Sequence, residues 1–141
     1  MEARLGLEPV AARLASQVAT RGDILRVYEA MHLVEKRVGL HVAADDADTN
    51  FHLAIVRASH NPYLIGMMMM VEHLIREHYA PFRQQMLSDA RLSRAFLDQH
   101  EKIYWAIRRH DGDNAFQAAQ AHILFSIESL RGLTRGRKGA F

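Results

Sequence analysis

The chain has 141 residues, a length that fits a single domain with a real hydrophobic core. Hydrophobic residues make up 49% of it and charged residues 24%, so a disordered chain is excluded, and the net charge of +2 is small. The lack of cysteine excludes disulfide bonds and thiolate metal sites, and no apolar run approaches the roughly 20 residues of a membrane helix. The first residues lack the apolar core of a signal peptide, so a cytoplasmic protein is expected.

Every long segment has the three-and-four spacing of apolar residues that is typical of helices, and no segment alternates like a strand. The first helix is expected to carry its apolar residues between Leu7 and Val18. Pro9 either lies early in this helix, where its missing N–H costs least, or kinks a longer helix that starts near Met1. The stretch Thr-Arg-Gly-Asp at 20–23 predicts a helix stop followed by a new N-cap.

Two helices should follow, divided by a loop over residues 39–45. The second helix is predicted from the apolar positions between Ile24 and Val38, and the third is predicted to run from about Asp46 to Ser59. Asn61 and Pro62 then have the residue types of an N-cap and a first helical position, so a fourth helix should begin there.

The fourth helix is unusually apolar and contains four consecutive methionines, residues 67–70. Because consecutive residues point to all sides of a helix, this segment is expected to be buried on several sides and central in the bundle. Pro81 should break or bend the helix, since proline removes a backbone hydrogen bond.

Two further helices complete the predicted fold, an all-α antiparallel bundle of about six helices. The fifth should run from about Asp89 to Arg109, and the sixth should carry apolar residues from Phe116 to Leu130 after a turn at 110–113. One helical domain is therefore expected over residues 1–132. Residues 133–141 are predicted to form a basic flexible tail, which contains Arg135, Arg137 and Lys138.

Three histidines and one aspartate interrupt the apolar faces of the predicted helices. Asp48 and His52 are four residues apart, so both project from one helix face, and apolar residues at 55 and 56 indicate that this face points inward. His100 and His122 each interrupt the apolar face of a separate helix. Interior polar groups need partners, so these four side chains should either hydrogen-bond to one another or bind one metal ion. The other six histidines lie in loops, at helix ends or among charged neighbours, where surface roles are expected.

Three imidazole nitrogens and one carboxylate oxygen suit zinc, with nickel, iron or manganese as alternatives. Such a divalent ion keeps about one positive charge and attracts an anion. Three roles remain open: a metal-dependent hydrolase or other metalloenzyme, a sensor for a small acid, or an ion that only ties helices together. Enzyme signatures are weak, because His100 and Glu101 begin a zinc-protease motif in which Tyr104 replaces the second histidine, and no nucleophile elbow or phosphate loop is present.

Five short motifs follow one another along nearly the whole chain. They are Arg4-x-x-Leu7-Glu8-Pro9, Asp48-x-x-Phe51-His52, Ala58-Ser59-x-Asn61-Pro62-x-Leu64, His100-x-x-Ile103-x-x-Ala106-Ile107 with Asp111 before Ala115, and Ala121-His122-Ile123. Each motif alone is weak, but their order and spacing from about Arg4 to about Leu130 are specific. In these motifs the chain resembles the C-terminal effector-binding domain, the FCD domain, of GntR-type bacterial transcription regulators of the FadR subfamily.

The resemblance implies a metal-dependent, effector-binding domain of a transcription regulator rather than an enzyme. Asp48, His52, His100 and His122 fall on the family's metal ligands, which would hold one divalent ion at the base of a cavity in the helical bundle. The ion would help to bind a small organic-acid or sugar-acid effector.

Two further residues match family positions that are candidates for effector binding. Arg4 could meet an effector carboxylate, or it could form a salt bridge with Glu8 one turn further on. Asn61 could contact the effector or act as a helix cap. The family also implies a homodimer, to which the first and fourth helices are expected to contribute, and no membrane partner. DNA would be bound only through an N-terminal winged helix-turn-helix domain, which this chain lacks, so the chain alone is not expected to bind operator DNA.

Overall fold

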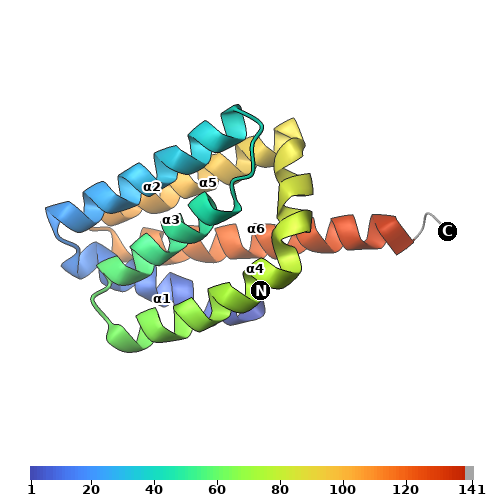
Figure 1. Ribbon diagram of the computed structural model, residues 1–141. Coiled ribbons are helices and arrows are strands. Elements are labelled where there is room, and N and C mark those ends of the chain that lie inside the picture. The colour runs from blue at the N-terminus through green and yellow to red at the C-terminus, as the bar shows by residue number, and fades with distance from the viewer. Residues whose placement is uncertain (139–141) are drawn as a thin grey trace.

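The described part of the chain folds into an all-α bundle, as the sequence predicts. The computed structural model describes the backbone of residues 1–138 and the side chains of this range apart from 77 and 135–138. Over this range all regular structure is helical. Six helices form the described fold (Figure 1): α1 (Glu2–Val18), α2 (Arg21–Gly39), α3 (Asp45–Ala58), α4 (Pro62–Ser88), α5 (Ala90–Arg108) and α6 (Gly112–Lys138).

Local sequence signals set the helix boundaries. The Thr20 side chain accepts a hydrogen bond from the backbone N–H of Asp23, and the Asp23 carboxylate accepts one from the Thr20 N–H, which makes a capping box at the start of α2. Asn61 caps α4 by accepting hydrogen bonds from the backbone N–H groups two and three residues further on. α1 takes the longer of its two predicted forms, with Pro9 inside the helix.

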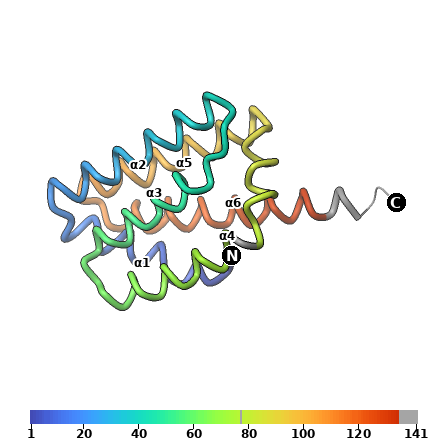
Figure 2. Tube along the Cα trace, in the orientation of Figure 1, coloured from blue at the N-terminus to red at the C-terminus, as the bar shows by residue number. Residues whose placement is uncertain are grey.

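The main apolar core joins helices that are distant in sequence. α1 packs along α6, α2 packs on α3, and α5 packs on both α6 and α2. Figure 2 shows α2 and α5 running side by side. All six helices contribute to the cluster, and burial of each large apolar side chain contributes about 1.5–3 kcal/mol to stability. The largest fully buried side chains of this cluster are Phe51, Met86, Phe96, Ile103 and Ile107.

α4 bends part-way along its length (Figure 1). Pro81 lies inside the helix, and a proline there removes one backbone hydrogen bond and crowds the preceding turn, which accounts for a kink. Of the two effects expected from Pro81, a break or a bend, the structure shows the bend, because the helix continues to Ser88. The bend turns the second half of α4 across the bundle, where Arg83 and Met86 are buried.

The four consecutive methionines are not central in the bundle, so this expectation was wrong. Met68 is fully buried in a small apolar cluster with side chains of α1 and α3. Met67, Met69 and Met70 are 47%, 53% and 70% exposed. The first half of α4 packs on α1 and α3 from one side, so most of its successive side chains point to solvent. No helix in the described range, this one included, is long and apolar enough to cross a membrane.

α6 extends past the predicted end of the domain. The sequence predicts a flexible tail from residue 133, but the backbone stays helical to Lys138. Leu133 packs against the main apolar cluster, which supports the additional turn, and the arginine and lysine residues that follow favour helix. Residues 139–141 of the predicted tail lie outside the described residues.

Candidate metal centre

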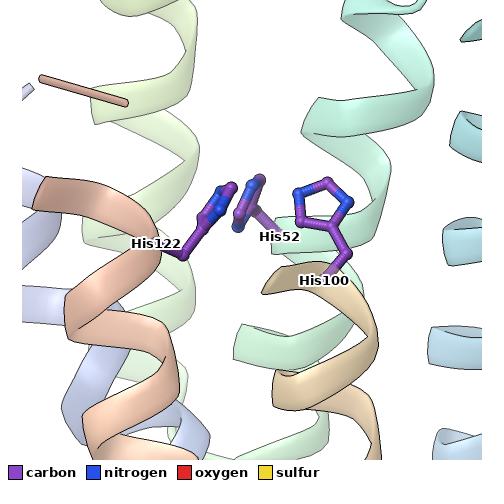
Figure 3. Close-up of side chains that lie close together, drawn as sticks. All are labelled: His52, His100 and His122. Atoms are coloured by element: carbon purple, nitrogen blue, oxygen red, sulfur yellow. The ribbon is translucent and has the colours of Figure 1, made fainter. Parts of the chain in front are cut away.

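The three histidines that interrupt apolar helix faces come together inside the bundle (Figure 3). His52 projects from α3, His100 from α5 and His122 from α6, and each is at most 1% exposed. One ring nitrogen of each histidine lies within 4.8 Å of ring nitrogens of the other two. Aromatic residues on the same helices fix this position, because the rings of Phe51 and Phe96 pack against the ring of His100.

Asp48 lies one turn before His52 on α3 and is 1% exposed. Its Oδ1 atom is 3.4 Å from Nε2 of His52 and 3.3 Å from Nε2 of His100, so it stands beside two of the three histidines. Its Oδ2 atom is 3.0 Å from Nη1 of Arg83, which reaches it from the second half of α4. Burial alone would raise the pKa of the Asp48 carboxyl, but Arg83 and His52 hold it well below its usual range. The carboxylate is therefore ionised.

Several buried polar atoms of this cluster have no hydrogen-bond partner among the described residues. A buried polar atom without a partner costs about 1–3 kcal/mol, so a concentration of them in one place requires a physical reason. Six atoms of the cluster, the unpartnered atoms, are in this position: Asp48 Oδ1, His52 Nδ1 and Nε2, His100 Nδ1 and Nε2, and His122 Nε2. A transition-metal ion would satisfy four of these atoms, because it accepts an electron pair from one nitrogen of each imidazole and from a carboxylate oxygen.

Two neighbouring side chains orient the imidazole rings. Oε1 of Gln99 is 3.1 Å from Nδ1 of His122, so Nδ1 carries the proton and donates it, and Nε2 is left as the potential ligand atom. Oε2 of Glu8, from α1, lies 2.8 Å from Nδ1 of His52, although not at the angle of an aligned hydrogen bond. A carboxylate beside one imidazole nitrogen favours metal binding at the other.

Burial keeps two of the histidines neutral, which is the form that binds metal. It lowers the pKa of His100 to about 4 and holds the pKa of His122 well below its usual range. Burial also acts to lower the pKa of His52, but the Glu8 carboxylate and Asp48 outweigh it and raise that pKa. At neutral pH His100 and His122 therefore present neutral imidazole nitrogens beside the ionised Asp48 carboxylate. The raised pKa of His52 favours its protonated form, so metal binding there would release a proton.

A second group of buried charges lies beside the histidines, between α1 and α4. Arg4 is 1% exposed, forms an ion pair with Glu8 and lies 3.5 Å from Oε1 of Glu72. The hydroxyl of Thr49 donates a hydrogen bond of 3.2 Å to Glu72. Arg4 thus forms the salt bridge with Glu8 that the sequence offered as an alternative role. Its Nη2 atom still has no hydrogen-bond partner within the described structure.

A small hollow beside these charges, the inner hollow, has a volume of about 10 Å³. Arg4, Asp48 and Arg83 are among the residues that line it. A much larger open groove of about 680 Å³ lies over α5 and α6 around Trp105, and its described lining includes none of the buried charges named above. The buried charges therefore lie at the smaller space, whereas the groove is lined by charged side chains of the surface such as Lys102 and Arg109.

Residues 1–125 match the FCD domain family. The chain belongs to this family. The resemblance that the sequence motifs predict is thereby confirmed, over nearly the same residues.

The relatives of this FCD domain include bacterial transcription regulators. The galactonate operon transcriptional repressor of Escherichia coli (strain K12) is 31% identical over 133 residues, which cover 94% of this chain and 57% of the relative. The putative L-lactate dehydrogenase operon regulatory protein of the same organism is 31% identical over 134 residues, which cover 93% of this chain and 50% of the relative. The chain thus spans about half the length of the curated relatives it matches.

A solved structure has the same fold as this FCD domain. E. coli McbR/YncC aligns with a TM-score of 0.75 over 94% of this chain and 63% of that chain. The sequence identity is 18%, so the likeness concerns the fold alone.

The FCD domain does not bring all predicted site residues together. The four predicted metal ligands lie side by side and Arg4 lines the inner hollow. Asn61 instead lies at the start of α4, where its side-chain oxygen accepts two backbone hydrogen bonds as a cap.

Three residues beside the cluster were not found by sequence reasoning. Glu72 offered a usable signal, because it shares one helix face with the buried Leu64 and Met68, where a carboxylate is unusual. Arg83 offered none, because it follows Pro81 and the helical period is uncertain beyond a proline. Gln99 also offered none. It directly precedes the buried His100, and consecutive residues of a helix project in different directions.

Proposed function

We propose that this FCD domain is a metal-dependent sensor of small carboxylates within a transcription regulator. The observation that carries the proposal is the group of unpartnered atoms beside two buried arginines. Asp48, His52, His100 and His122 would hold one divalent ion, zinc in the first place, with nickel, iron or manganese as alternatives. Such an ion supplies a position at which a ligand carboxylate binds.

The balance of buried charges supports an anionic ligand. Three carboxylates, those of Glu8, Asp48 and Glu72, and two guanidinium groups, those of Arg4 and Arg83, are buried around the histidines. With all three histidines neutral, as metal binding requires, this group carries one net negative charge, which a divalent ion would change to one net positive charge. A carboxylate ligand would balance that charge, and Nη2 of Arg4, which lacks a partner among the described residues, would donate to it.

The names of the relatives agree with this class of ligand. One relative is named for a galactonate operon and another for an L-lactate dehydrogenase operon, and galactonate and lactate are both hydroxy acids. We therefore expect a small organic acid or sugar acid as the effector and a domain without catalytic activity. Arg4 is the preferred effector contact, and Asn61 is a weaker candidate because its side-chain oxygen already caps α4. DNA recognition would belong to a separate winged helix-turn-helix domain.

Elemental analysis of the purified protein tests the metal. About one equivalent of a first-row transition metal is expected, and His122→Ala should lose most of it. His32→Ala is the matched control, because the His32 side chain is 48% exposed on α2 and should not affect the metal content. Full metal occupancy in His122→Ala would refute the ligand assignment.

Thermal unfolding tests the carboxylate. Citrate, L-lactate and D-galactonate are added to the metal-loaded and to the chelated protein, and at least one should raise the melting temperature of the metal-loaded form alone. A ligand at 100 times its Kd stabilises by about 2.7 kcal/mol, which is easily measured. Arg4→Met should weaken this response. An equal rise in the chelated protein would argue against ligation through the ion, and turnover of the acid would favour the metalloenzyme reading.

We further propose that the domain forms a homodimer through the first half of α4. Four exposed apolar side chains on this helix follow one another at spacings of four, three and four residues, which is the spacing of a coiled-coil seam. An exposed apolar stripe marks a protein interface, and methionine side chains adapt readily to a partner. The four residues are Tyr63, Met67, Met70 and Leu74, with exposed fractions of 80%, 47%, 70% and 55%.

The spacing of four, three and four residues is the same from either end of the stripe. Two copies of the helix can therefore pack antiparallel with their exposed apolar side chains opposite one another. In an antiparallel pair related by a two-fold axis, Met67 of one copy would face Met70 of the other, and Tyr63 would face Leu74. Sedimentation of Met67→Glu combined with Met70→Glu should therefore show a monomer at concentrations where the parent is a dimer. Leu124→Glu on α6, at a residue 44% exposed, is the control and should leave the dimer intact. A dimer of the double variant would place the interface elsewhere.

A further inference from the structure

A second hollow adjoins the inner hollow at the end of the bundle where α1 begins. This outer hollow has a volume of about 160 Å³ and lies between the start of α1, α4 and the later turns of α6. Figure 1 shows the N-terminus beside α4 and α6 at this end of the molecule. Met1 and Leu130 line both hollows, so these two side chains stand between the outer hollow and the buried charges.

We propose that Met1 and Leu130 form the mouth through which small anions reach the buried site, and that the mouth is closed in the described conformation. This inference rests on the proposed carboxylate-binding function. The Met1 side chain is 5% exposed and Leu130 is 7% exposed, so together they cover the passage. The inner hollow, at about 10 Å³, has room for roughly one water molecule, so a carboxylate must displace these side chains to enter.

The approach past the histidines is less able to open. On the side of α3 and α5, the histidine rings pack against Phe51 and Phe96, which belong to the main apolar cluster. At the mouth, in contrast, two unbranched or singly branched aliphatic side chains can change rotamer without breaking a hydrogen bond. The rim is held by an ion pair of 2.9 Å between Glu2 of α1 and Arg131 of α6. Both side chains are more than 60% exposed, so this pair is solvated and screened by salt.

The position of the mouth connects the ligand to the start of the domain. Arg4 follows Met1 by three residues on α1, and its guanidinium lines the inner hollow. An anion that enters would displace the Met1 side chain and then bind the Arg4 guanidinium, and both residues lie at the start of α1. Any residues joined before Met1 would leave from the rim of the mouth, and their position would depend on whether the mouth is open.

The lack of cysteine in the chain allows a direct test of the mouth. Ser126 lines the inner hollow and is 5% exposed, so the Ser126→Cys variant carries a single thiol behind the mouth. Its rate of reaction with the thiol reagent DTNB is measured in the chelated protein, without an N-terminal tag. Leu130→Ala should raise this rate about tenfold, because truncation opens the passage locally, and Leu130→Trp should lower it.

Two controls separate a local mouth from general loosening of the fold. Leu64→Ala removes the same atoms from a leucine of similar burial, 8% exposed, in the small apolar cluster. It should leave the reaction of the Ser126→Cys thiol within about twofold of the parent. Ser93→Cys places a thiol at a residue 8% exposed and outside both hollows, and Leu130→Ala should not speed its reaction.

The outcomes decide the proposal independently of metal binding. It is overturned if Leu130→Ala leaves the Ser126→Cys rate unchanged, or if Leu64→Ala raises that rate equally. If Leu130→Ala does not fold, Leu130→Val should still give a smaller increase, and no increase would count against the mouth. Because the labelling is done in chelator, failure of the mouth leaves the metal and carboxylate tests standing, and failure of those tests leaves the labelling result interpretable.

Discussion

Replacement of His100 by leucine tests whether this histidine is present to bind a metal ion or to stabilise the core. His100 is fully buried between Phe51 and Phe96, and both of its ring nitrogens belong to the unpartnered atoms. Leucine has a similar volume and no polar atom, so His100→Leu removes the two nitrogens and keeps the packing. Removing each unpartnered nitrogen should stabilise the fold by about 1–3 kcal/mol. Part of this gain is lost, because the Oδ1 atom of Asp48 no longer has the His100 ring nitrogen 3.3 Å away. We therefore expect the metal-free variant to be about 1–3 kcal/mol more stable than the metal-free parent.

Urea unfolding at pH 7, in chelator and with added zinc, measures this change. Zinc should stabilise the parent and have little effect on His100→Leu, because the variant lacks one of the proposed ligands. Ile103→Leu, in the same core and on the same helix, is the control: it should change stability by less than about 1.5 kcal/mol and keep the zinc response. The reasoning is refuted if His100→Leu is less stable than the parent in chelator, since His100 would then be a satisfied core residue.

Three further predictions concern the pKa of His100, the ion pair between Arg83 and Asp48, and the helix cap at Asn61. The pKa of His100 is lowered from 6.5 to about 4, so below pH 6.5 the unfolded parent binds more protons than the folded parent and the parent loses stability. In chelator, urea titrations should therefore show the advantage of His100→Leu growing as the pH falls from 6.5 towards 4, by up to about 1.4 kcal/mol per pH unit. Arg83→Leu leaves Asp48 buried without its guanidinium partner, so it should destabilise by about 3–5 kcal/mol and weaken zinc binding about 10–100-fold in a competition titration. Asn61→Ala removes the cap of α4 and should cost about 1 kcal/mol in urea unfolding. It should leave the carboxylate-dependent rise in melting temperature intact, and loss of that rise would assign Asn61 to the effector.

The helices and the histidine cluster could be predicted from the sequence because both depend on short-range patterns. Thr20 and Asn61 are caps that act within three residues, so the starts of α2 and α4 are readable locally. His52, His100 and His122 each occupy a core position of their own helix, and inward faces of a bundle converge. Helix assignment therefore places the three histidines on the axis of the bundle, and the packing of α3, α5 and α6 brings them to the same level.

The remaining features depend on contacts between distant segments. The methionine run shows that a segment is apolar, but not whether it packs inside its own bundle or remains on the surface, and Met70 is 70% exposed. Arg83 reaches Asp48 only because α4 bends, and no local pattern defines the direction of that bend. The extra turn of α6 beyond residue 132 rests on the packing of Leu133 against a core built from all six helices.

α4 links the two proposed interactions of the domain. Its first half carries the apolar stripe proposed as the dimer seam, and its second half brings Arg83 to Asp48 and to the inner hollow. A ligand carboxylate in that hollow would compete with Asp48 for Arg83 and so change the forces on the bent helix. Because binding at one site and pairing at the other act on the same helix, each should change the free energy of the other by an equal amount. The metal-loaded domain should therefore dimerise with an affinity that depends on the carboxylate, and the carboxylate should bind with an affinity that depends on protein concentration.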